Sequence, residues 1–162
     1  MGGHGALTLY LASKTKQYRS ASAFAPISNP TKCPWGEKIF AGYLQGGVAE
    51  AKERYDATEL ISQIMEPVNI LIDYVSKTFP ASDHNVRQVI GKGTGDSFYK
   101  QGQLLPENFV TAARGAGHDE GRVRVRRQEG YDHSYYFVSN IGREKVHIHR
   151  KLLDFYICIR SC

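Results

Sequence analysis

The feature that most constrains the fold is the largely apolar run Val68–Ile72 (VNILI), which Asp73 closes. Apolar residues in succession, rather than in alternation, are typical of a strand buried on both faces of a parallel sheet. Two further strands are predicted, at Ser20–Ala25 and at Arg122–Gln128, and the alternating arginines of the second indicate one solvated face. Helical patterns separate the three strands, and this order predicts an α/β fold with a parallel sheet.

Helices are predicted on both sides of each strand. Gly2–Ser13 carries apolar residues at helical spacing, with small glycine and alanine residues suited to close packing. Asp56–Glu59 is typical of a helix start, with an early acid that suits the helix dipole. Gly115 is predicted to cap a helix over 103–114. The other helical patterns lie at 37–44 and 133–153.

Length and composition narrow the class of protein. The chain has 162 residues, 41% hydrophobic and 23% charged, which suits one soluble domain. It contains no apolar run of about 18 residues and no secretory signal, so neither a membrane span nor export is predicted. The chain has an odd number of cysteines, Cys33, Cys158 and Cys162, and their spacing is not that of metal ligands. This pattern favours a reducing compartment without a disulfide framework.

The net charge of +5 is confined to residues 75–92 and 143–162. A nucleic-acid-binding surface needs a continuous basic face with interleaved aromatic residues. In the best local candidate, Arg122–Arg127, arginine and valine alternate, which is typical of a strand with one solvated face. Nucleic acid is therefore not a predicted partner.

The first residues, Met1-Gly-Gly-His-Gly-Ala-Leu7, are the strongest functional signal. This sequence is typical of the residues that follow the serine of a G-x-S-x-G nucleophile elbow, where glycines permit a sharp turn and close helix–sheet packing. The serine itself would stand immediately before Met1. Taken alone, the same residues are equally compatible with a flexible start.

Two candidate residues, each following a later strand, would complete a catalytic triad in the chain order Ser, Asp, His. Asp96 follows the strand at Val68–Ile72 after an interruption, and His133 follows the strand at Arg122–Gln128. His133 would act as the general base, and Asp96 would hold its tautomer. The alternatives are a turn aspartate beside glycine for Asp96 and a helix-start residue for His133.

The other histidines are weaker candidates. His84 and His118 lie in predicted loops and are expected to be solvated. His147 and His149 are two residues apart, so on a helix they point in different directions and make a poor metal pair. No metal site is predicted.

Seven segments together resemble the S-formylglutathione hydrolase (esterase D) family. The resemblance covers most of residues 1–153, and the CPWG and QEGYDHSYYF segments are the most specific. The segments are Met1–Leu7, Ser22–Gly36 (with CPWG), Ala41–Leu44, Tyr55–Thr58, Asn69–Asp73, Gly102–Phe109 and Gln128–Phe137 (QEGYDHSYYF).

The resemblance implies a cytoplasmic α/β-hydrolase that acts as a serine thioesterase, or carboxylesterase, in formaldehyde detoxification. Its substrate would be a glutathione thioester, cleaved to formate and glutathione without cofactor or metal, and the family often forms homodimers. Carried over by position, Asp96 and His133 match the family's acid and base. Met1 matches the residue whose backbone N–H contributes to the oxyanion hole, and Trp35 lies in a loop near the substrate.

The chain departs from the family pattern in three places. It begins just after the nucleophilic serine, so it is expected to hold the C-terminal portion of the α/β-hydrolase fold, about three parallel strands with flanking helices, without the N-terminal half. Residues 75–92 interrupt the partial domain 1–153 as a non-family insertion, and 154–162 form a non-family tail. The insertion has the boundaries of a short in-frame intron, which indicates a gene-model or fragment product.

These departures leave two interpretations open. In the first, the chain derives from an S-formylglutathione hydrolase and is inactive as written, because the nucleophile is absent. In the second, it is a non-catalytic remnant of the same fold that at most binds or pairs with another chain. The motifs set aside a third interpretation, an unrelated basic binding module.

Overall fold

The computed structural model describes residues 2–13, 17–75, 97–128, 131, 133, 135 and 137–142. Several predictions concern residues outside this set. These are Met1, Asp96, residues 76–92 of the predicted insertion, the tail 154–162, His84, His147, His149, Cys158 and Cys162.

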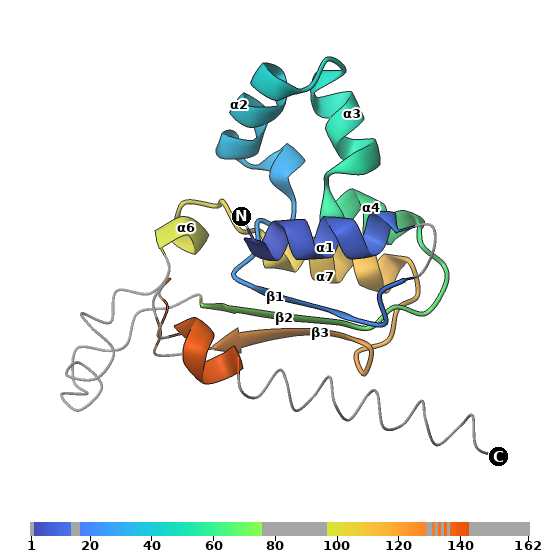
Figure 1. The fold of residues 1–162 in the computed structure, drawn as a ribbon, viewed down its shortest axis with the longest axis vertical. Helices are drawn as coiled ribbons and strands as arrows, with labels where there is room; N and C mark the ends of the chain where they lie inside the picture. The colour runs from blue at the N-terminus through green and yellow to red at the C-terminus, as the bar shows by residue number, and fades with distance from the viewer. Residues whose placement is uncertain are drawn as a thin grey trace.

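Three parallel strands form the sheet, in the order β1(Ala21–Phe24), β2(Ile70–Val75) and β3(Val123–Gln128) (Figure 1). Ile72 pairs with Ala23 of β1 on one side and with Val125 of β3 on the other. All six residues of β2 are buried. The predicted α/β class, the parallel sheet and the doubly buried central strand are therefore confirmed.

The central strand begins at Ile70 rather than at the predicted Val68, and it runs past Asp73, which was predicted to end it. Asp73 lies inside β2, opposite Arg126 of β3, and the strand continues to Val75, which pairs with Gln128. A buried carboxylate is tolerated when charged or polar donors replace its water, and Arg126 and Gln128 both donate to Asp73. Val75, the first residue of the predicted insertion, is thus the last residue of a strand.

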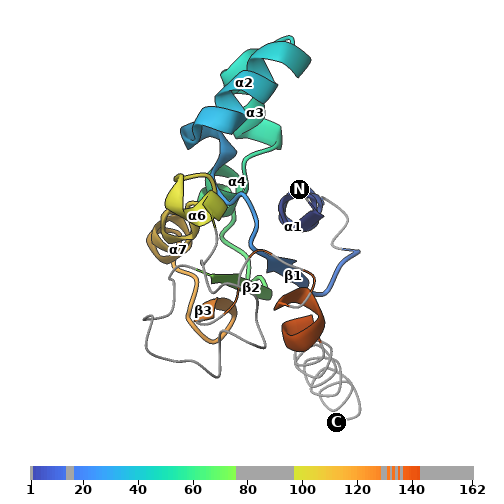
Figure 2. The ribbon, with the colours of Figure 1, turned by 90° about the vertical axis from the view of Figure 1, so that its left-hand side faces the viewer.

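Helices α1(Gly2–Ala12), α4(Ala57–Gln63) and α7(Pro106–Gly115) cover one face of the sheet (Figures 1 and 2). Their apolar side chains join those of the strands in one core, which includes Leu7, Ile61, Ile72, Phe109 and Val123. This arrangement follows the predicted order of helices and strands. It also leaves the carboxyl ends of the strands beside the start of α1, where a site can form.

Close packing of α1 depends on a glycine, as predicted. A Cβ atom at Gly3 would lie 2.8 Å from the carbonyl oxygen of Phe24, closer than side-chain carbons come to such atoms. Gly2 and Gly5 have open space at the same position. Gly3 is therefore the residue that brings the start of α1 against the end of β1.

Two helices project from the sheet layer as an arm, α2(Pro34–Tyr43) and α3(Gly47–Arg54), preceded by the 3-10 turn η1(Pro30–Lys32) (Figure 1). The helix predicted at 37–44 is α2, which begins earlier because Pro34 occupies its first turn. Helix α3 was not predicted. Ala51 is its one buried residue, so the segment lacks the apolar period that reveals a helix.

Two predictions for the second half of the chain, concerning Gly115 and His118, are wrong. Gly115 is the last residue of α7 rather than its cap, and the left-handed turn falls at Gly117 (φ +86°). His118 is buried rather than solvated, because this turn folds its backbone N–H onto the carbonyl of Ala113. Residues 137–142 are helical, within the helix predicted at 133–153, and the short helix α6(Ser97–Lys100) precedes α7.

Candidate active site

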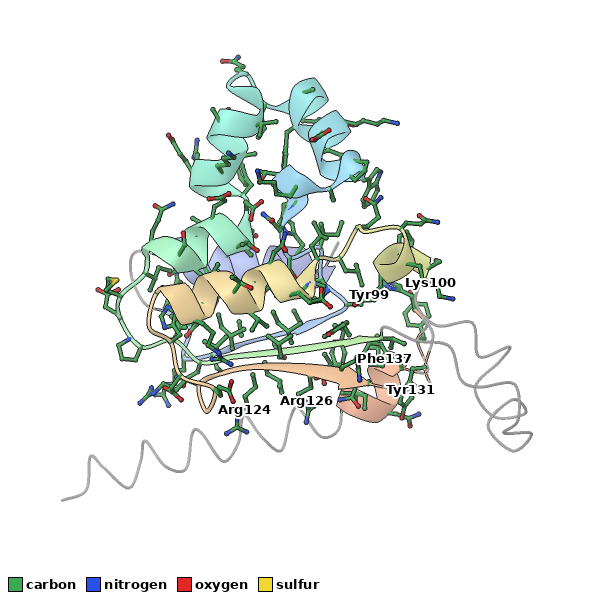
Figure 3. The ribbon with its side chains drawn as sticks, turned by 180° about the vertical axis from the view of Figure 1, so that it is seen from behind. Tyr99, Lys100, Arg124, Arg126, Tyr131 and Phe137 are labelled. Carbon is green, nitrogen blue, oxygen red and sulfur yellow. The ribbon has the colours of Figure 1, made fainter. Side chains whose placement is uncertain are left out.

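The candidate site lies at the carboxyl ends of the three strands, the edge at which open parallel sheets bind ligands. Helix α6 and the helical residues 137–142 lie at this edge (Figure 1). Phe137 packs edge-on against Phe24 at the end of β1, with ring centroids 5.7 Å apart, and also contacts Tyr131. Figure 3 shows Tyr99, Tyr131 and Phe137 around this edge. Together with Val75 and Ile27 they belong to one hydrophobic cluster.

His133, the predicted base, follows β3 and is exposed. Its imidazole packs against the ring of Phe98 in α6, with centroids 4.9 Å apart and planes inclined by 65°. Asp96 immediately precedes α6 in the sequence but lies outside the described residues. The structure thus brings the segment after Asp96 onto the His133 ring.

Trp35 stands at the start of α2 and is 43% exposed. Its backbone N–H donates to Oε1 of Gln103, 3.3 Å away, which ties the CPWG turn to the chain ahead of α7. The sulfur of Cys33 caps α2 by accepting from the N–H of Gly36. Burial raises the pKa of the Cys33 thiol. Cys33 is therefore a structural cap.

A buried carboxylate fixes the loop between β1 and α2. Asp56 caps α4 by accepting from the backbone N–H groups of Thr58 and Glu59. Its other oxygen, Oδ2, accepts from Asn29 at 2.8 Å and from both the backbone and the hydroxyl of Thr31, at 2.9 and 2.7 Å. One side chain thus closes a helix end and holds the turn that leads to Trp35.

His4 reinforces the same loop from α1. Its Nδ1 lies 3.0 Å from the carbonyl oxygen of Ile27 and donates to it in the neutral ring. Burial lowers the pKa of His4, although the bond to Ile27 opposes this shift. His4 therefore links the start of α1 to the segment that follows β1. In the sequence it lies three residues after the predicted oxyanion residue Met1, which is outside the described residues.

A cluster of two tyrosines and a carboxylate anchors α6. The hydroxyl of Tyr99 donates to Oε1 of Glu107 at 2.7 Å, and that of Tyr74 reaches the same oxygen at 3.4 Å. The hydrogen bond to the Glu107 carboxylate raises the pKa of Tyr99 to about 12. Burial is the main reason that the pKa of Tyr74 is raised.

The sequence predicted His133 and Trp35 as site residues, but it did not reveal the residues that contact them or hold their segments in place. Phe98, Gln103 and Asp56 carry no recognisable catalytic pattern, although Asp56 and Gln103 fall inside family-like segments. Within the described ranges, no group of three metal-ligating side chains occurs. No helix in that part of the chain is long and apolar enough to cross a membrane.

Comparison with known proteins defines the class. A family model described as "Putative esterase" matches residues 1–153. The chain belongs to this esterase family, which fits its parallel α/β sheet.

The relatives are S-formylglutathione hydrolases. The chain is 43% identical over 158 residues to that of Rattus norvegicus and 41% identical over 155 residues to that of Arabidopsis thaliana, covering 95% of this chain in both cases. A solved structure of an S-formylglutathione hydrolase from Agrobacterium tumefaciens is 31% identical with a TM-score of 0.71, over 93% of this chain and 46% of that one. The chain spans about half the length of these relatives, 47% of the rat protein.

Proposed function

We propose that the chain supplies the acid–base half of an S-formylglutathione hydrolase, a serine thioesterase that releases formate and glutathione. The observation that carries the proposal is the placement of His133. Its ring lies at the carboxyl edge of the sheet against Phe98, two residues after Asp96. The S-formylglutathione hydrolases to which the chain is similar support the substrate class.

In the proposed reaction, a serine immediately before Met1 attacks the formyl carbon while His133 takes its proton. Asp96 holds the His133 tautomer and stabilises the imidazolium. The backbone N–H of Met1 donates to the developing oxyanion. The C–S bond then breaks and the glutathione sulfur receives the proton from His133. Water, deprotonated by His133, attacks the formyl-serine ester, formate is released, and His133 returns the proton to the serine oxygen.

Trp35 is proposed to contact the thioester substrate. It is partly exposed, and its backbone N–H is held by Gln103, in the segment that joins α6 to α7. An indole ring in this position offers a flat apolar surface with one N–H donor. The proposed reaction needs only a serine nucleophile, an oxyanion donor and proton transfer by His133, so neither a cofactor nor a metal is proposed.

The proposed whole protein is a cytoplasmic enzyme that forms homodimers. Within this chain, the hydrolase portion is proposed to be 1–153, with an insertion at 75–92 and a tail at 154–162. Sequencing the mature transcript tests the intron origin of the insertion, and a spliced message that retains its codons would refute it.

The decisive experiment is a chimera in which the amino-terminal half of the rat relative, ending in its elbow serine, is fused ahead of Met1. S-formylglutathione hydrolysis is followed by loss of thioester absorbance, and the 162-residue chain alone serves as the serine-free control. We expect activity in the chimera, and its loss in His133→Ala. Tyr135→Ala is the matched control, since Tyr135 lies two residues away and is 93% exposed. A folded but inactive chimera would instead favour a non-catalytic role.

A further inference from the structure

We propose that Phe98 is a positioning residue that holds the imidazole of His133 in its working orientation. This inference rests on the proposed function for its catalytic consequence, but the contact itself is testable separately. Phe98 and His133 lie on separate elements far apart in sequence, and their rings meet 4.9 Å apart with an interplanar angle of 65°. This is edge-to-face geometry, the arrangement that aromatic pairs prefer.

The chemistry of a general base explains why an apolar ring suits this position. In the proposed reaction the two nitrogens of His133 are both engaged, one by Asp96 and one by the serine hydroxyl. A polar neighbour would compete for these nitrogens. A phenyl ring restricts the imidazole by contact and has no polar atom that competes for these nitrogens.

Phe98 can restrict His133 because its own segment is held at several points. Just after α6, the N–H of Gln101 donates to the carbonyl of Ser97 at 3.0 Å, and that of Gln103 donates to the carbonyl of Phe98 itself at 2.8 Å. The neighbouring Tyr99 is fixed to Glu107 of α7 at 2.7 Å.

The anchoring extends to the sheet and to α2. The Tyr99 ring packs on Tyr74 of β2 with centroids 5.5 Å apart. The side chain of Gln103 accepts from Trp35 at the start of α2. Phe98 is itself 43% exposed, so its ring contributes little to the core. A substitution there should alter the His133 orientation without unfolding the chain.

The first test is NMR of the full 162-residue chain with labelled histidine. The His133 ring signals are assigned by their loss in His133→Gln. We expect cross-relaxation between the Phe98 and His133 rings, and an aromatic ring-current shift of the His133 signals that disappears in Phe98→Leu. Phe98→Tyr keeps a ring and should retain the shift. Tyr43→Leu, which removes an 84% exposed aromatic residue from α2, should leave the His133 signals unchanged.

The second test uses the active chimera. Because misplacement of a catalytic group by about 1 Å costs on the order of 100-fold in rate, Phe98→Leu should lower kcat by about 10-fold or more with little change in KM. Phe98→Tyr should restore kcat. Identical His133 signals in wild type and Phe98→Leu would overturn the inference, as would an unchanged kcat. An inactive chimera with the ring contact intact would refute the proposed function while leaving the contact established.

Discussion

Arg126 of β3 and Asp73 of β2 form a two-point ion pair across the sheet. The Nε–Oδ1 distance is 2.8 Å and the Nη2–Oδ2 distance is 3.0 Å. Gln128 adds a third donor to Oδ1 at 2.6 Å. The Asp73 side chain is fully buried, while that of Arg126 is 27% exposed. Arg124 and Arg126 lie on the side of β3 that faces away from α7 (Figure 3).

We predict that Arg126→Ala lowers the free energy of unfolding by about 3–5 kcal/mol, because it leaves a buried carboxylate without its cation. Urea unfolding measures the change. Arg124→Ala is the matched control on the same strand. Its exposed side chain makes a bond to Gly121, and its loss should cost about 0.5 kcal/mol or less. Equal effects of the two substitutions would show that the ion pair contributes no more than a surface contact.

Two glycines of α2 should respond in opposite directions to alanine. A Cβ atom at Gly36 would overlap the backbone carbonyl of Pro30, whereas Gly42 has open space. Gly36→Ala should therefore destabilise the chain, and Gly42→Ala should stabilise it by about 0.5–1 kcal/mol, the usual gain inside a helix. Thermal unfolding of both variants checks the prediction, and a stabilised Gly36→Ala would contradict the packing at the CPWG turn.

Asp56→Ala should destabilise the chain by about 1–3 kcal/mol, because it removes the α4 cap and leaves buried donors of Asn29 and Thr31 unsatisfied. Asp119→Ala is the control. Asp119 also accepts two backbone N–H groups, from Gly121 and Arg122, but in an exposed turn. Denaturant unfolding of both variants should show a clearly larger loss for Asp56→Ala, and a reversed ranking would refute this role.

The Tyr99–Glu107 bond predicts a pH dependence of stability. The pKa of Tyr99 is raised from 10.0 to about 12 in the folded chain, so its stabilisation is complete below pH 10 and is lost as the pH rises through 12. The stability difference between wild type and Tyr99→Phe should shrink over this interval. Urea unfolding at several alkaline pH values tests this, with exposed Tyr43→Phe as the control. A difference that is constant with pH would exclude the bond as its source.

The sequence determined the sheet and the approximate place of the candidate site. The largely apolar run at 68–72 identified a doubly buried strand, and the alternation of strands with helical segments identified a parallel sheet. Both properties depend on local pattern, so one sequence suffices to detect them. Motifs also predicted His133 and Trp35 as site residues. The structure places the His133 ring against Phe98 of α6 and ties the backbone of Trp35 to Gln103.

Only the tertiary structure decided which residues support those motifs. Asp73 was predicted to end a strand, but an arginine 53 positions away in the sequence allows its carboxylate to stay buried inside β2. His118 was predicted to be solvated, but it is buried, directly after a left-handed turn at Gly117. The contact between Phe98 and His133 likewise joins separate elements. Burial of a polar group and orientation of a ring depend on partners brought together by folding, and those partners leave no periodic signal in the sequence.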